Sequence, residues 1–298
     1  MIIFSACCVI VLVVMSPEPA HAWGPVTHIA LGMQVLATVI TPEHPLQATL
    51  IKLPEIFLYG GLAPDIVQGR RLQSRLRRHS HNWDTGFGLL GSASTPEQQA
   101  LACGYLAHLA ADVVAHNYFL PARFIGRFES GIASHLYTEA RFDTFQAHEY
   151  RDLLVKLLRV DFGVLNRTLK HAIDSPLLSF SAHQRVFEGG LRRIREFHGL
   201  LRRLGGPDEA EVEDFGLFSH ASCAAIGGIL GGADSAPACR FDPMGEEVIR
   251  DAVDLRRKLQ RLAKIDASAR AMAREMSSTM VSEVRAHLQQ SPFVSCLG

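Results

Sequence analysis

Apolar residues recur at helical spacing along almost the whole chain. Over residues 26–40 they predict a helix, because Pro25 stands at a natural first-turn position and Pro42 lies beyond the end. A second helix is predicted over residues 46–59, with a kink or break at Pro54. The sequence contains no alternating stretch long enough to build a sheet. The pattern therefore predicts an all-α protein.

Start signals place a long helix in the middle of the chain. Thr95 is a hydroxyl cap, Pro96 takes the first helical position, and Gln98 follows three residues after the cap. The helix that begins here is predicted to run to about Phe119, before Pro121. Further helices are predicted over residues 134–160 (one or two helices), 184–204 and 245–289.

Residues 1–22 have the features of a signal peptide. An apolar run is followed by a proline-containing break and by Ala20-His21-Ala22, an A-x-A cleavage pattern. The run is shorter than the roughly 20 residues that a membrane span needs, and no Lys or Arg precedes it. We therefore predict an exported protein, secreted or periplasmic, whose mature chain begins at Trp23. The new α-amino group, with a pKa of about 8, can bind a metal together with a nearby imidazole.

Charge and cysteine content add three expectations. Lys plus Arg and Asp plus Glu are equal at 30 each, so no overall field favours nucleic acid or a membrane surface as a partner. Cys223 and Cys239 flank a glycine-rich stretch, and in an exported protein we predict that they pair and close it as a loop. Cys103 lies on an apolar helical face and is expected to be a buried free thiol.

The central predicted helix carries potential metal ligands. His108, Asp112 and His116 are spaced four residues apart, so they lie within roughly 80° of one another on one helix face. Their neighbours are apolar, and burial of these groups without partners would cost several kcal/mol. Coordination of a metal removes that cost and uses these ligand types. A metal site is therefore a better interpretation than a polar surface stripe.

Three other segments contain residues that can bind a metal. Taken one at a time, each segment also fits a common structural role. His135 and Glu139 have the i, i+4 spacing of a surface hydrogen bond as well as of a ligand pair. Asp65 follows a glycine-loosened turn and a proline, where an N-cap would also fit. His79 and His81 alternate beside a tryptophan in a segment that reads as a loop.

Taken in order, these residues resemble the zinc-dependent phospholipase C family, whose relatives are the fungal single-strand zinc nucleases. The resemblance covers about residues 23–143 and implies a multi-helix bundle with a trinuclear zinc site. The implied ligands are Trp23, His28 and Asp112 for one zinc, Asp65, His81, His108 and Asp112 for a second, and His116, His135 and Glu139 for the third.

Two features depart from the well-known members. His116 follows Asp112 by four residues, where the family spacing is six, so the chain looks like a subgroup whose activity the resemblance does not settle. The second-zinc histidine is either His81 or His79. We prefer His81, because His81-Asn82-Trp83-Asp84 resembles the histidine–aromatic–aspartate segment of the family.

The resemblance implies three regions. They are a signal peptide at 1–22, a zinc-dependent phospholipase C-like helical domain at 23–205, and a C-terminal helical region at 206–298 without an assignable function. After residue 150 we recognise no segment that resembles the family. The acidic run 208–214 is the best candidate for a loop between two lobes.

The function implied is that of a zinc metallohydrolase. We expect phospholipase C-like hydrolysis of phospholipid to diacylglycerol and a phosphorylated head group, with a transient membrane-surface contact. Asp65 is the candidate to orient or deprotonate the attacking water. One alternative is a zinc nuclease or nucleotidase, which needs base-stacking aromatics such as Trp83 and Tyr137. Another is a zinc-stapled helical binding protein without catalysis. Sequence does not give the oligomeric state.

Overall fold

The computed structural model describes residues 23–66, 79–130, 140–173 and 208–294, with a few positions between 182 and 199. These residues form helices and include no β-strand, which confirms the all-α fold. Residues 1–22, the ligand candidates His135 and Glu139, Tyr137 and most of the predicted helix over 184–204 lie outside the described part. Besides η1 and α8, which are described below, the described helices before residue 175 are α2 (Pro25–Thr38), α3 (Gln47–Lys52), α4 (Pro54–Ile66), α6 (Trp83–Gly91), α7 (Pro96–Val114), α10 (His148–Leu157) and α11 (Gly163–Ala172).

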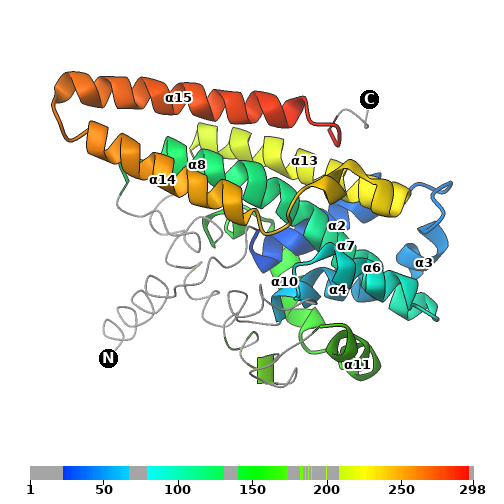
Figure 1. Cartoon of the computed structure of the whole chain (residues 1–298). Helices are drawn as coiled ribbons and strands as arrows, with labels where there is room; N and C mark the ends of the chain where they lie inside the picture. Colours follow the sequence, from blue (N-terminus) through cyan, green and yellow to red (C-terminus); the bar gives the residue numbers. More distant parts are fainter. Residues whose placement is uncertain are drawn as a thin grey trace, which may run out of the picture.

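Helix α7 forms the centre of the fold (Figure 1). Thr95 caps it by accepting a hydrogen bond from the Gln98 amide at 3.2 Å, as predicted. The helix does not end near Phe119. It continues through a π-helical turn, η1 (Ala115–Phe119), into α8 (Leu120–Gly126). Pro121 is accommodated because it lies in the first turn of α8, where its missing N–H is not needed.

Glycines let α4 cross α7 at backbone contact. A Cβ on Gly60 would lie 2.2 Å from the carbonyl oxygen of Leu101, and one on Gly104 would lie 1.9 Å from that of Phe57. Only glycine allows so close an approach. The crossing brings the C-terminal turn of α4 beside the middle of α7.

The local structure around Asp65 differs from the prediction. The break at Pro54 is confirmed, since α3 ends before it and α4 begins at it. The predicted turn before Asp65 is wrong, because α4 continues through its glycines and Pro64 to Ile66. Packing on α7 outweighs the weak helix propensity of glycine, and Asp65 lies in the last helical turn.

The C-terminal region packs on the same core. It contains α13 (Glu209–Gly232), the 3₁₀ turns η2 (Ala233–Ser235) and η3 (Pro237–Arg240), α14 (Glu246–Leu262) and α15 (Ala267–Gln289). Helix α13 contacts α7 and α2, and α14 and α15 contact α8 (Figure 1). By length and composition α13 could cross a membrane, but 56 % of its apolar stretch is buried in the protein, as in a core helix.

The acidic run at 208–214 is not a loop. It begins α13, and Glu211 accepts hydrogen bonds from Arg123 at 2.9 Å, from Arg141 at 3.1 Å and from Arg127. Asp214 is bonded in turn to Arg285 of α15. These arginines compensate the buried carboxylates, so the run can fold against α8 and α15.

The predicted disulfide is also absent from the structure. Cys223 and Cys239 are free, because the glycine-rich stretch between them continues α13 as helix and is not a loop that needs closing. Cys103 is a buried free thiol, as expected, and burial raises its pKa to about 12. Cys296 lies outside the described residues.

Candidate metal centre

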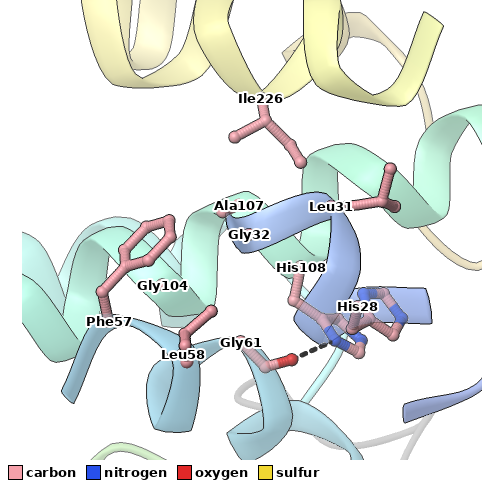
Figure 2. A pocket seen from close by; sticks show the side chains of 10 residues that line it. All are labelled: His28, Leu31, Gly32, Phe57, Leu58, Gly61, Gly104, Ala107, His108 and Ile226. Carbon is pink, nitrogen blue, oxygen red and sulfur yellow. Dashed lines mark hydrogen bonds between the residues drawn. The ribbon is translucent and has the colours of Figure 1, made fainter. Parts of the chain in front are cut away.

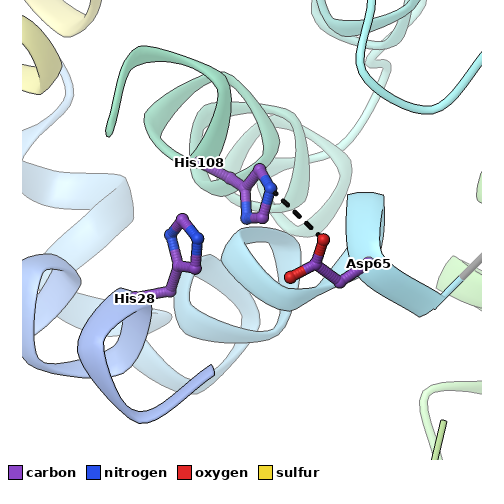
Figure 3. Close-up of side chains that lie close together, drawn as sticks. All are labelled: His28, Asp65 and His108. Carbon is purple, nitrogen blue, oxygen red and sulfur yellow. Dashed lines mark ion pairs between the residues drawn. The ribbon is translucent and has the colours of Figure 1, made fainter. Parts of the chain in front are cut away.

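Four segments bring histidines and aspartates to one buried position. Figure 3 shows His28, Asp65 and His108 turned toward one another from α2, α4 and α7. His28 is 6 % exposed, and the other members of the cluster are exposed by 1 % or less. The cluster consists of His28 (α2), Asp65 (α4), His81 (in the turn before α6), His108 and Asp112 (both α7).

The atoms of four members have the spacing of zinc ligands. The Nε2 atoms of His81 and His108 lie 3.1 Å apart. Asp65 Oδ1 is 3.3 Å from the first nitrogen and 3.7 Å from the second. Asp112 Oδ2 is 3.5 Å and 3.2 Å from the same two atoms. Zinc bonds of about 2.0–2.2 Å place tetrahedral ligand atoms about 3.3–3.6 Å apart. The distances from each carboxylate oxygen to the two Nε2 atoms are close to this range, and His81, His108 and Asp112 form one triad that could hold a metal ion.

Hydrogen bonds at the far side of the rings orient these histidines. His108 Nδ1 donates to the carbonyl oxygen of Gly61 at 2.8 Å, which leaves the lone pair on Nε2 when the ring is neutral. His81 Nδ1 lies 3.0 Å from the Ser80 hydroxyl, and Tyr105 donates its hydroxyl to the Ser80 carbonyl. If both rings carry their proton on Nδ1, the two Nε2 lone pairs face each other and would suit a shared cation.

Asp112 faces two groups with its two oxygens. Its Oδ1 lies 3.4 Å from His28 Nε2, and the His28 ring stacks on His108 with a centroid distance of 3.9 Å. Neither oxygen of Asp112 accepts a hydrogen bond from the described residues, and His28 Nε2 has none either. Buried polar atoms without partners are costly, and a bound cation would remove that cost.

The charge states fit this arrangement. Burial opposes ionisation of Asp112, but His108 and His116 outweigh it and hold its pKa well below 3.8. Burial and the neighbouring His108 lower the pKa of His28 below 6.5. At neutral pH the aspartate is therefore an anion and His28 a neutral imidazole, which are the forms that bind metal.

His116 lies beside this cluster rather than within it. Its Nδ1 is 3.9 Å from Asp112 Oδ2 and donates to the carbonyl oxygen of Pro243 at 2.6 Å. The π-helical turn that begins at Ala115 alters the regular angular step at His116. The ring nitrogen that remains for a metal is Nε2.

The indole of Trp23 is fully buried. It stacks on Phe119 with a centroid distance of 4.7 Å and an interplanar angle of 20°, and it contacts Phe142. Its Nε1 donates to the Ser222 hydroxyl at 3.2 Å. These contacts with η1 and α13 fix residue 23 immediately before the helix that carries His28.

Sequence reasoning missed the role of Asp143. Its carboxylate accepts hydrogen bonds from the amide of Val26 at 3.2 Å and from the amide and hydroxyl of Thr27 at 2.9 and 2.7 Å. Asp143 thus caps α2, although it is distant in sequence, because Gly24 at the N-cap has no side chain that could do so. No local pattern signals such a cap, since its partners are more than a hundred residues away.

The structure brings His81 rather than His79 to the cluster. His79 contributes its carbonyl oxygen, which accepts a hydrogen bond from Thr85 at 3.0 Å. On the side toward α13 the centre adjoins a small cavity, lined by His28, His108 and apolar residues such as Leu58 and Ile226 (Figure 2). Apolar walls keep the local dielectric low and strengthen the electrostatic interactions of the centre.

Comparison with known proteins agrees with this geometry. The family model described as zinc dependent phospholipase C matches residues 27–185, which is more than half of the chain. The expectation that the family likeness ends near residue 150 is therefore wrong. No curated protein and no solved structure matches the chain. A helical fold, a buried histidine–aspartate cluster with zinc-like spacing and this match lead to one conclusion: the chain belongs to the zinc-dependent phospholipase C family.

Proposed function

We propose that the protein is an exported zinc metallohydrolase that cleaves phosphodiesters, with phospholipid as its substrate. The observation that carries the proposal is the buried Asp112 carboxylate. Its oxygens face two separate sets of nitrogen atoms and accept no hydrogen bond from the described residues. Family membership supports a phospholipase C-like activity and Zn²⁺ as the cofactor.

We assign three zinc positions to these residues and to His135 and Glu139. One is assigned to Asp65, His81, His108 and Asp112, and a second to Asp112, His28 and the backbone of Trp23. The third is assigned to His116 with His135 and Glu139. Zinc at such a centre polarises a phosphoryl oxygen and makes a water ionise near neutral pH.

We assign Asp65 the task of orienting the attacking water and accepting its proton. Its carboxylate is buried, and Oδ1 faces the two histidine Nε2 atoms. Oδ2 is then the oxygen that can take the proton.

We also propose that cleavage after Ala22 completes the centre. The buried indole holds residue 23 in place, and Asp143 holds the start of α2, so a free amine at Trp23 would be delivered next to His28. An amide at this position would be a poor ligand. Maturation during export would then switch the enzyme on.

The nuclease alternative has less support. It requires aromatic rings that can stack on bases, yet the Trp83 indole already stacks on Phe87 and donates to the carbonyl oxygen of Phe241 at 2.9 Å. We therefore retain phospholipid as the substrate class.

A paired assay tests the proposal. Mature protein and Asp112→Asn are supplied with zinc and given phosphatidylcholine vesicles or single-stranded DNA, and released phosphocholine or nucleotide is measured. We expect turnover of the lipid by the mature protein, and a loss of at least 100-fold in the variant. Nucleotide release alone would identify a nuclease, and zinc binding without either product would identify a zinc-stapled binding protein.

A further inference from the structure

The loop between η3 and α14 covers the end of the metal centre. Three successive carbonyl oxygens of this loop accept hydrogen bonds from side chains of the first half of the chain. Phe241 accepts from Trp83 Nε1 at 2.9 Å, Asp242 from Asn117 Nδ2 at 2.9 Å, and Pro243 from His116 Nδ1 at 2.6 Å.

The loop has a fixed conformation of its own. The Asp242 carboxylate accepts hydrogen bonds from the amides of Met244 at 3.0 Å and Glu246 at 3.2 Å, which caps α14. Gly245 has φ +55°, a conformation that favours glycine. A Cβ on Gly245 would lie 2.7 Å from the Cβ of His116 and 2.8 Å from its carbonyl oxygen, so the loop is pressed against this histidine.

The contact with Pro243 sets the chemistry of His116. A carbonyl oxygen can only accept, so Nδ1 carries a proton, and in the neutral ring the lone pair is then on Nε2. The same hydrogen bond restricts rotation of the His116 ring about its side-chain torsion angles. Hydrogen bonds of this kind to a ligating histidine typically change metal affinity or activity by about 10–100-fold.

We propose that loop 241–245 is a positioning element for His116, which makes the C-terminal region part of the metal centre. The proposal rests on the proposed function, in which His116 is a zinc ligand. Asn117 has a special place in it, because its amide joins the Val113 carbonyl of α7, at 2.9 Å, to that of Asp242. It therefore ties the loop to the helix that carries the ligands.

Two variants loosen the loop, and each has a matched control. Asn117→Ala removes the amide that holds Asp242, whereas Gln260→Ala removes a similar amide-to-carbonyl bond, to Phe128 at 2.8 Å, away from the cluster. Gly245→Ala places a methyl group against His116, whereas Gly231→Ala adds one on α13 where no atom lies within 4 Å.

The readout is zinc affinity, measured on the mature protein by competition with a chelating dye and by elemental analysis, together with the absorption spectrum of the cobalt(II) form. We expect one ion to bind about 10–100-fold more weakly in Asn117→Ala and Gly245→Ala, with an altered cobalt spectrum, and both controls to match the wild type. If Gly245→Ala does not fold, Asn117→Ala decides. Wild-type affinities and spectra in the loop variants would overturn the proposal.

The variant His116→Ala distinguishes failure of the loop proposal from failure of the third zinc position on which it rests. If His116→Ala keeps every zinc ion, His116 is not a ligand, and both the third zinc position and the loop proposal fail. If it loses one ion while the loop variants lose none, the zinc position stands and only the loop proposal fails.

Discussion

Asp143 accepts hydrogen bonds from both the backbone amide and the hydroxyl of Thr27, at 2.9 and 2.7 Å. This one carboxylate caps the N-terminus of α2, the helix that carries His28. It lies next to Phe142, which packs on the Trp23 indole. The position of residue 23, the N-terminus of the proposed mature chain, relative to the candidate metal centre therefore depends on a residue far away in the sequence.

The pKa of Asp143 predicts a pH-dependent stability. Burial raises it from 3.8 to about 6, although the bonds from Thr27 oppose the shift. The folded state thus holds the proton more tightly than the unfolded chain, and the stability that it gains is complete below pH 3.8 and is lost as the pH rises through about 6. Relative to Asp143→Asn, the wild type should lose at most about 3 kcal/mol of unfolding free energy over this range. Urea unfolding of both proteins at several pH values measures it, and a constant difference would refute the assignment.

Gly24 is predicted to tolerate no side chain. A Cβ there would lie 2.3 Å from Cγ and Oδ2 of Asp143, so the cap and the start of α2 have to separate. Gly24→Ala should therefore lower the unfolding free energy by about 1–2 kcal/mol, the cost of a lost cap, and weaken zinc binding. Gly91→Ala is the control, since no atom lies within 4 Å of a Cβ at that position. Equal stability of the two variants would contradict the role of Asp143.

Glu211 is predicted to be essential for the packing of α13. Its removal would leave the buried Arg123 guanidinium with Asp214, at 3.4 Å, as its remaining carboxylate partner, and loss of one partner of a buried polar group typically costs about 1–3 kcal/mol. Thermal unfolding of Glu211→Ala should show a clearly lower melting temperature than that of the wild type. Lys156→Ala breaks the exposed ion pair with Glu55 and should cost at most about 1 kcal/mol. Similar melting temperatures for both variants would show that the buried ion pairs of Glu211 do not stabilise the packing of α13.

A residue added before Trp23 is predicted to remove one zinc position. The added residue converts the amine into an amide, which is a poor ligand at neutral pH, and Asp112 loses the metal on its Oδ1 side. The extended protein should bind one zinc ion fewer than the mature form and lose most of its turnover. Equal zinc content and equal activity would exclude the amine of Trp23 from the centre.

The sequence predicted those parts of the centre that are local to one helix. His108 and Asp112 were found from i, i+4 spacing on an apolar helix, and Thr95 from its capping signal. Asp65 was predicted as a candidate ligand, but it was placed after a turn. It lies in a helix, because the close contact between Gly60 and Gly104 keeps α4 helical.

The remaining parts depend on tertiary contacts that have no sequence pattern. The carbonyl oxygens of Gly61 and Pro243 orient His108 and His116, and any residue type can supply a carbonyl. The helix beyond Phe119 was missed because a π-helical turn precedes Pro121. The disulfide was expected because Cys223 and Cys239 flank a glycine-rich stretch that resembles a loop, whereas packing of α13 on the core makes that segment a helix.

The central claim is that Asp112 joins two zinc positions within the buried cluster. Anomalous diffraction at the zinc absorption edge, from crystals of the mature protein, tests it most directly. We predict one peak within about 2.2 Å of the Nε2 atoms of His81 and His108 and of Asp112 Oδ2, and a second between Asp112 Oδ1 and His28 Nε2. A fully zinc-loaded crystal without a peak at either position would contradict the account.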